Sequence, residues 1–427
     1  MRRCRPPLLA LALTALPAAT VAQGLPTAMP AEVGLSPERL ARLDAFASRL
    51  VEEGEIAGAV VLLARRGRVA HVEAYGSADR EGGTSMREDA IFRICSMSKP
   101  ITSVAAMMLY EEGHFLLDDP AGRFLPELSS PLVIVPAGDS YGTVPATGPI
   151  TIRHLLTHTS GISYRFFGLP IVADIYAAAG VTDGLSETEL DLAENVRRIA
   201  AQPLLHEPGE RMSYGLNTDV LGRLVEVVSG MSLGEFLEQR IFGPLRMVDT
   251  GFRVPEPKLG RIPTIYRSDR GERLERLPEG NHEEGHVVFA AGYPYRGPRT
   301  YESGGGGLVS TASDYARFAQ MLLNRGELDG VRLLSRKTVE LMTADHLMGR
   351  EGSDDGFGLG LSVARPPGES GGIVSAGTWG WSGFYTTNFW IDPEEEMIGV
   401  ILTQTYPFNG GRVLDRLRAV AYTAIAD

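Results

Sequence analysis

The spacing of apolar residues switches between helical and strand patterns along the chain. Residues 36–54, "SPERLARLDAFASRLVEEG", begin with a serine suited to cap a helix, and apolar residues follow at helical spacing: Leu40, Leu43, Phe46 and Leu50. Residues 57–76, "AGAVVLLARRGRVAHVEAYG", contain two apolar runs on either side of a short turn, which predicts a β-hairpin. Residues 98–113, "SKPITSVAAMMLYEEG", show a helical pattern that ends at a glycine.

The remainder of the chain divides into a middle segment and a C-terminal segment. Residues 120–300 are rich in proline, glycine and short helical patterns, so we predict a largely helical insertion there. After residue 304, a glycine-rich turn leads into a helix, and "FGLGLSV", "TTNFWID" and "EMIGVILTQT" predict strands before a closing helix. Strands near both ends predict an α+β fold, in which residues 36–119 and 301–427 build one sheet within a single domain of residues 36–427.

Composition agrees with a folded domain and excludes some partners. The chain has 427 residues, of which 44% are hydrophobic and 22% are charged, so it can bury a substantial core. The net charge is −12 and no basic run occurs. The sequence therefore has no electrostatic signature of binding to nucleic acid or to an anionic membrane.

The first residues, "MRRCRPPLLALALTALPAATVAQG", predict a secretory signal peptide over residues 1–22. Arginines precede an apolar stretch, and small residues before Gln23 predict cleavage near Ala22 and a periplasmic or secreted protein. The alternative is a retained N-terminal anchor, although the apolar stretch is too short for a stable membrane span. Cys4 precedes the apolar stretch, which is the wrong place for lipidation.

Residues 91–102, "IFRICSMSKPIT", place three candidate nucleophiles near one candidate base, Lys99. Ser96 alone has the Ser-x-x-Lys spacing, which puts both side chains on one face of a helix. A neutral lysine there can take the serine proton. Pro100 fits only a first helical turn, so Ser96 lies near free backbone N–H groups that can hold an oxyanion. Cys95 is the only cysteine of the predicted mature chain and is interpreted as a packed residue.

Two other motifs are weaker candidates. "GDSYG" (138–142) matches Gly-x-Ser-x-Gly around Ser140, but the following "TVPATGP" does not allow the helix that a nucleophile elbow opens. "HEEGH" (282–286) matches the zinc pattern with His282 and His286, but "LPEGN" before it and Gly285 within it break a helix. We interpret it as a solvated loop and predict no metal and no cofactor.

Two further segments have both a functional and a structural interpretation. Tyr214, in "PGERMSYGLNTDVLG", precedes a helical pattern, and a tyrosine beside a lysine can move protons in catalysis. A tyrosine in that place is more often a packing residue. "TWGWSGFYTTNFW" (378–390) is either a core strand or, because of its glycines, a strand that a ligand approaches closely.

Taken together, the motifs resemble the serine β-lactamase-like proteins, and most closely the class C-like branch. The similarity rests on phrases in the expected order from about Ser36 to the C-terminus: "CSMSKPIT", "HLLTHTSGIS", "PGERMSYGLNTDVLG", "IFGPLRMVDTGF", "GGGGLVSTASDYARFAQMLLNRGELDGVRLLS" and "WGWSGF". This resemblance implies a central antiparallel sheet with an inserted helical domain and an active site between them.

The resemblance also implies residue roles. Ser96 would be the acylated nucleophile, Lys99 its base and Tyr214 the tyrosine of the second motif. The backbone N–H groups of Ser96 and Phe384 would form the oxyanion hole. Trp381 and Gly383 would belong to the third motif, on the strand that lines the site.

Departures from the family pattern point to one branch. β-Lactamases of this class have Tyr-x-Asn, but here Leu216 takes the asparagine position, and Asn217, one residue later, is the candidate substitute for binding substrate. Trp381 replaces the lysine or histidine that pairs with a substrate carboxylate. The pattern therefore resembles family VIII carboxylesterases, whose substrates are neutral esters. That branch also contains Gly-x-Ser-x-Gly sequences that are not catalytic.

From these residues we expect an exported serine hydrolase that cleaves small-molecule carboxylic esters through an acyl-serine. The alternatives are a β-lactamase, a D-amino-acid peptidase or an acyltransferase that uses the same site. An alternative of another class is a non-catalytic acyl-binding or sensor domain. Candidate pocket residues by position are Tyr164, Phe166, Phe167 and Trp379. The sequence makes no prediction of oligomeric state.

Overall fold

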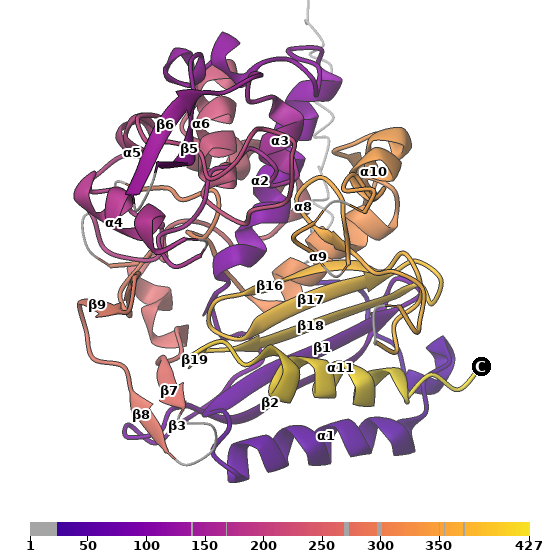
Figure 1. The fold of residues 1–427 in the computed structure, drawn as a ribbon. Coiled ribbons are helices and arrows are strands. Elements are labelled where there is room, and N and C mark those ends of the chain that lie inside the picture. Colours follow the sequence, from indigo (N-terminus) through magenta and orange to yellow (C-terminus); the bar gives the residue numbers. More distant parts are fainter. Residues whose placement is uncertain are drawn as a thin grey trace, which may run out of the picture.

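The computed structural model describes residues 24–137, 140–167, 169–268, 273–296, 301–349, 351–353, 355–369 and 372–427 (Figure 1). The predicted signal peptide of residues 1–22, with Cys4, lies outside the described residues. Within the described part, no helix is both long enough and apolar enough to cross a membrane.

An eight-stranded antiparallel sheet forms the centre of the fold, with the strand order β14-β15-β16-β17-β18-β1-β2-β3. Its strands come from both ends of the chain, because β18 pairs with β1 in the register Ala59↔Thr403. Their bounds are β1 Gly58–Arg65, β2 Arg68–Asp79, β3 Thr84–Ser85, β14 Gly356–Phe357, β15 Ser362–Val363, β16 Trp379–Gly383, β17 Thr387–Asp392 and β18 Met397–Thr403. The predicted α+β fold class is confirmed.

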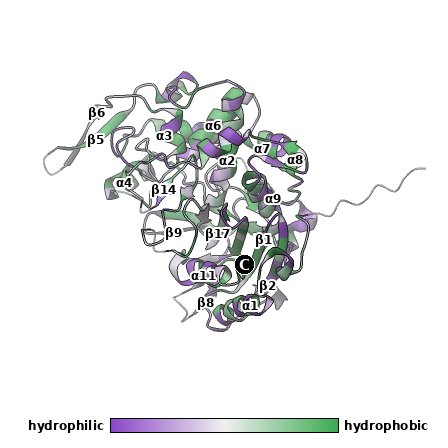
Figure 2. Ribbon diagram, turned by 90° about the vertical axis from the view of Figure 1, so that its right-hand side faces the viewer, coloured by the Kyte–Doolittle hydropathy of each residue, from purple (hydrophilic) through white to green (hydrophobic). Residues whose placement is uncertain are grey.

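Helices cover both faces of this sheet, which explains why all eight residues of β1 are buried. Val60 and Leu62 pack in the cluster that contains Phe318 of α9 (Ala312–Leu323). The β1 residues that alternate with these, Ala59, Val61 and Leu63, pack against α1 (Pro37–Glu52) and α11 (Asp415–Tyr422) on the other face (Figure 1). In Figure 2 the strands around β1 are coloured as hydrophobic, whereas α1 shows both colours, as expected of a helix with one buried face.

A second layer of helices stands above the sheet and holds the start of α2 (Ser98–Glu111) (Figure 1). Helix α2 packs against α6 (Asn217–Ser229). The other α-helices are α3 Ile152–Leu156, α4 Pro170–Ala178, α5 Leu192–Ala200, α7 Leu233–Leu237, α8 Gly243–Leu245 and α10 Arg336–Met342. Short 3₁₀ or π helices are η1 Pro30–Val33, η2 Cys95–Met97, η3 Ala121–Arg123, η4 Pro126–Leu128, η5 Glu238–Phe242, η6 Glu256–Arg261 and η7 Gly410–Leu414.

The segment 120–300 contains more strand than its patterns predict. It includes the hairpins β5–β6 and β9–β10, and two strands, β7 and β8, that form a small sheet with β19. The bounds are β5 Leu132–Ala137, β6 Ser140–Pro145, β7 Tyr266–Ser268, β8 Leu274–Arg276, β9 Asn281–Glu284, β10 Val287–Ala290 and β19 Thr405–Tyr406. These runs are short, so their periodicity is too weak to separate a strand from a loop.

Two short strand pairs complete the fold. Strand β4 (Phe92–Arg93) pairs with β11 (Val309–Ser310), and β12 (Glu327–Leu328) pairs with β13 (Val331–Arg332). The β4–β11 pair joins the segment just before Ser96 to the segment just after the glycine-rich turn. It therefore brings two of the sequence motifs together.

Candidate active site

Ser96 lies in η2, where the end of strand β16 meets the start of α2. Cys95, the residue before it, has a φ of 46°, a left-handed conformation that is unfavourable for any residue with a side chain. Gly383 lies against this turn, because a Cβ at Gly383 would collide with the carbonyl oxygen of Ile94. Glycine at the end of β16 thus allows the strand to approach the nucleophile segment closely.

Lys99 is the centre of the polar network around Ser96. Its Nζ lies 3.1 Å from Ser96 Oγ, 3.0 Å from the Tyr164 hydroxyl and 2.6 Å from the carbonyl oxygen of Gly305. Only 1% of Lys99 is exposed. An ammonium group has an acceptor here for each of its three protons. A neutral amine in the same place can donate to Tyr164 and Gly305 and accept the Ser96 proton.

The two competing side chains near Lys99 have other roles. Burial raises the pKa of the Cys95 thiol to about 12, which leaves little thiolate at neutral pH. The hydroxyl of Ser98 is fully buried and accepts a hydrogen bond of 3.1 Å from the backbone N–H of Leu308. Both residues therefore hold the structure around Ser96.

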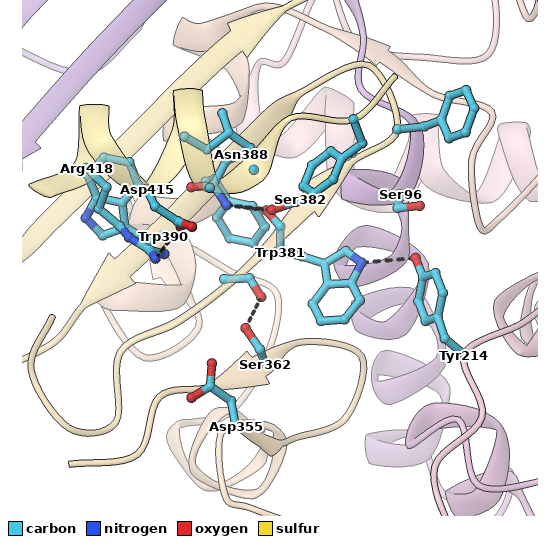
Figure 3. Close-up of a pocket in the computed structure, with 18 of the residues that line it drawn as sticks. Ser96, Tyr214, Asp355, Ser362, Trp381, Ser382, Asn388, Trp390, Asp415 and Arg418 are labelled. Carbon is cyan, nitrogen blue, oxygen red and sulfur yellow. Dashed lines mark hydrogen bonds and ion pairs between the residues drawn. The ribbon is translucent and has the colours of Figure 1, made fainter. Parts of the chain in front are cut away.

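Tyr214 contacts Lys99 through its ring. Lys99 Nζ lies 4.7 Å from the centre of that ring, whereas the Tyr214 hydroxyl accepts a hydrogen bond of 3.1 Å from the indole N–H of Trp381 (Figure 3). Among the described residues, the tyrosine hydroxyl bonded to Lys99 is that of Tyr164. The Tyr164 hydroxyl therefore contacts the base, whereas the Tyr214 hydroxyl contacts Trp381, a division that the sequence motifs do not show.

Buried ionisable groups lie close to the network of Lys99 and the two tyrosines. His158 packs on the Tyr214 ring with centroids 4.8 Å apart, and burial lowers the pKa of its imidazole well below the usual value. Burial likewise raises the pKa of Asp219 to about 6, while Lys99 and hydrogen bonds act in the opposite direction. Asp219 accepts a hydrogen bond of 2.9 Å from Tyr301. His158 and Tyr164 belong to "HLLTHTSGISY". Sequence analysis used this segment for the family resemblance and Tyr164 as a pocket candidate, but it assigned neither residue a contact with Lys99 or Tyr214.

The structure places Asn217, the candidate substitute for binding substrate, inside the protein. Asn217 is fully buried and does not line the cavity that contains Ser96. Its Nδ2 donates to the carbonyl of Ile162 at 3.2 Å and lies 3.1 Å from His158 Nδ1, and its Oδ1 accepts from Ser160. As the first residue of α6, it points into the protein and ties the helix to the segment that carries Tyr164.

Trp381, Gly383 and Phe384 all line the cavity with Ser96. The backbone N–H groups of Phe384 and Tyr385 lie beside the Cys95 thiol, so the end of β16 reaches the residue next to the nucleophile. This placement fits an oxyanion hole formed by the N–H groups of Ser96 and Phe384, and the assignment stays a prediction.

The cavity has a volume of about 830 Å³ and an aromatic wall near Ser96. The four residues suggested by position all line it: Tyr164, Phe166, Phe167 and Trp379. Tyr164 stacks on Phe166 with ring centroids 4.9 Å apart. In the described part of the lining, Arg418 is the only lysine or arginine, and it lies 2.9 Å from Asp415. Beyond the polar network of Ser96 and Lys99, the near wall of the cavity is therefore aromatic, and the guanidinium in its described lining is paired.

The weaker motifs lie away from this site. Ser140 begins β6, is exposed, and pairs with Ala137 in the β5–β6 hairpin, so no helix follows it as an elbow requires. His282 lies in β9, which pairs with β10 in a β-hairpin, where the sequence predicted a loop. Among the described residues, no three His, Cys, Asp or Glu side chains gather as a metal site.

Comparison with known proteins identifies relatives along nearly the whole chain. The model of the Beta-lactamase family matches residues 43–424. Protein Rv1367c of Mycobacterium tuberculosis is 37% identical over 370 residues, which are 83% of this chain and 88% of that protein. Esterase EstB of Burkholderia gladioli is 34% identical over 394 residues, which are 90% and 95% of the two chains. The solved structure of EstCE1, a hydrolase with promiscuous acyltransferase activity, has 31% identity and a TM-score of 0.78 over 91% of this chain and 98% of its own.

Proposed function

This chain belongs to the beta-lactamase family as an esterase-like serine hydrolase, and from that premise we propose that Ser96 cleaves carboxylic esters through a covalent acyl-serine. The observation that carries the proposal is the contact of Lys99 Nζ with Ser96 Oγ at 3.1 Å, inside a cavity with an apolar wall. The substrate is a small-molecule ester. The residues of the site supply the nucleophile, the base and the proton donor.

In the first step, neutral Lys99 takes the Ser96 proton while Oγ forms a bond to the ester carbonyl carbon. The charge that develops on the carbonyl oxygen is stabilised by the N–H groups of Ser96 and Phe384. The carbon–oxygen bond to the alcohol then breaks. Tyr214, whose hydroxyl accepts from Trp381, donates its own proton to the departing oxygen. The proton that Lys99 took from Ser96 then returns to Tyr214 through solvent in the cavity, because Lys99 Nζ faces the Tyr214 ring and bonds instead to the Tyr164 hydroxyl.

In the second step, water attacks the acyl carbon and its proton passes to the same base, so that the Ser96–acyl bond breaks. The released acid leaves Ser96 and Lys99 in their starting states. The sequence of proton transfers reverses that of the first step, with Tyr164 and Gly305 holding Lys99 in position throughout.

Trp381 favours a neutral ester over a β-lactam or a D-peptide. Both of those substrates carry a carboxylate, and binding it requires a positive or hydrogen-bonding partner. Trp381 presents an indole ring, and its N–H donates to Tyr214. The buried position of Asn217 removes the second group that would hold an amide side chain.

The test uses purified protein and Ser96→Ala, with p-nitrophenyl butyrate and a chromogenic cephalosporin as substrates. We expect ester turnover in the wild type, its loss in the variant, and little cephalosporin cleavage. Intact-protein mass spectrometry of a stopped reaction should show the butyryl adduct on wild type only. Retained ester activity in Ser96→Ala would contradict the site assignment. Rapid cephalosporin cleavage would favour a β-lactamase, and a permanent adduct without turnover would favour a sensor.

Acyl transfer to an alcohol is a second candidate function. The aromatic wall beside Ser96 offers an apolar surface to an acceptor alcohol, and EstCE1 is described as a hydrolase with promiscuous acyltransferase activity. Vinyl butyrate and benzyl alcohol in buffer would give benzyl butyrate if transfer competes with hydrolysis. Butyric acid as the sole acyl product would exclude this candidate.

The proposal that the protein is exported rests on the N-terminal residues alone. We propose that residues 1–22 are removed during secretion, which would begin the mature chain at Gln23. Expression of the full chain in a Gram-negative host, followed by fractionation and N-terminal sequencing, tests this. A cytoplasmic protein that retains Met1 would contradict it.

A further inference from the structure

The cavity that contains Ser96 continues past strand β16 onto the face of the sheet covered by α11. In register, Ser382 of β16 lies opposite Asn388 of β17, and Gly380 lies opposite Trp390. Side chains alternate along a strand, so these four positions share one face. All four line the cavity, together with Asp415 and Arg418 of α11 (Figure 3). We call this part the α11 compartment.

Two buried polar atoms in the wall of the α11 compartment have no hydrogen-bond partner among the described residues. They are the Oδ1 oxygen of Asn388 and the Nε1 nitrogen of Trp390, and the two residues are 6% and 1% exposed. Burying such groups without a partner is unfavourable, so an unpaired acceptor and an unpaired donor two residues apart need an explanation.

Both side chains are held in place. Asn388 donates through Nδ2 to the carbonyl of Trp381 at 3.1 Å and to Ser382 Oγ at 3.0 Å, which fixes Oδ1 as the unpaired atom. The Trp390 ring lies over Gly399, where any side chain would collide with it, and stacks on Tyr422 at 6.3 Å. The unpaired acceptor and the unpaired donor are therefore held in fixed positions.

The charges in this compartment favour a neutral ligand. Its guanidinium, that of Arg418, forms an ion pair with Asp415 at 2.9 Å, so the pair carries no net charge. The other carboxylate in the described lining of the cavity, that of Asp355, would repel an anionic ligand (Figure 3). A carboxylate would meet Trp390 Nε1 as a donor but would repel the Asn388 oxygen. A hydroxyl or a primary or secondary amide has both an acceptor for the Trp390 N–H and a donor for the Asn388 oxygen.

We propose that the α11 compartment binds a hydroxyl or amide group of the substrate, at a distance from the ester that Ser96 attacks. The proposal rests on the proposed esterase function and adds a substrate class to it: esters that carry a neutral hydrogen-bonding group away from the scissile bond. The two ends of the cavity then bind different parts of the substrate. The aromatic end with Ser96 holds the reacting ester, and the α11 compartment selects the polar end.

The experiment compares matched esters on the full chain. One series consists of p-nitrophenyl esters whose acyl chains of increasing length end either in a hydroxyl or in a methyl group. The other consists of butyrate esters of α,ω-diols and of the corresponding simple alcohols. At the matching length in one series, we expect kcat/KM to favour the hydroxylated ester by about 3- to 30-fold, the range for one or two hydrogen bonds.

Trp390→Phe removes the indole N–H and should reduce that preference to less than about threefold. Tyr422→Phe is the matched control, because it changes an aromatic residue in the same packing region without touching the cavity lining, and it should keep the preference. A preference that survives in Trp390→Phe would overturn the proposal. So would equal rates for hydroxylated and methyl esters in both wild-type series, a result that does not depend on any variant folding. Absence of ester turnover in the wild type would instead contradict the proposed function.

Discussion

Replacing Tyr164 by phenylalanine tests whether the hydroxyl that contacts Lys99 is required for catalysis. The change removes the oxygen that lies 3.0 Å from Lys99 Nζ and keeps the ring that stacks on Phe166 at 4.9 Å. Tyr164 is 3% exposed, so water cannot easily replace the lost hydroxyl. The expected defect is therefore in the orientation of Lys99, with little change in packing.

The magnitude follows from the value of a hydrogen bond to an ionisable group. Such a bond contributes about 1.5–3 kcal/mol, which corresponds to a loss of about 10- to 150-fold in kcat/KM. The fall should appear mainly in kcat and less in KM, because the Tyr164 hydroxyl positions the base Lys99 and is not needed to bind the substrate.

The assay is the initial rate of p-nitrophenyl butyrate hydrolysis, measured for Tyr164→Phe and Tyr214→Phe in parallel. Tyr266→Phe is the matched control, since Tyr266 is a fully buried tyrosine in β7 whose hydroxyl donates to Glu81 at 2.6 Å. It should lose no more than about twofold in rate. If Tyr164→Phe behaved like this control, the reasoning that assigns Lys99 alignment to Tyr164 would be refuted.

Three further predictions concern the groups around this network. Burial lowers the pKa of His158, so below the unfolded-state value near 6.5 protons bind the unfolded chain in preference and the folded state loses stability as the pH is lowered. Relative to His158→Gln, the unfolding free energy of the wild type in urea should fall by up to about 1.4 kcal/mol for each pH unit below about pH 6.5. Parallel curves of unfolding free energy against pH for the two proteins would contradict this. Gly383→Ala should abolish ester hydrolysis, because the new Cβ would collide with the Ile94 carbonyl beside the nucleophile; a folded variant with normal kcat would show that this approach is not needed. The Cys95 thiol, with its pKa raised to about 12, should resist iodoacetamide at pH 8 in the native protein and react after unfolding, as measured by mass spectrometry, and rapid native labelling would disagree with its burial.

Several parts of the fold followed from local patterns. Ser36 caps α1 by accepting from the backbone N–H of Arg39 at 3.3 Å, as its position before the apolar run predicted. The hairpin of β1 and β2 turns at residues 66–67, between its two apolar runs. In 120–300 the same reasoning was less successful, because three- to six-residue strands have too few residues to show a period.

The sequence by itself determined the pair Ser96 and Lys99, because residues three apart at the start of a helix must share a face, whatever the rest of the protein does. It also indicated that Trp381 replaces a cationic residue. Only the tertiary structure decided which hydroxyl meets Lys99, since Tyr164 is 65 positions away and reaches it through the packing of the helical layer. The same packing turned Asn217 inward, and the separate packing of α11 on the sheet placed Asp415 and Arg418 along the cavity. Contacts within one turn follow from backbone geometry, whereas contacts between distant segments depend on how whole elements pack.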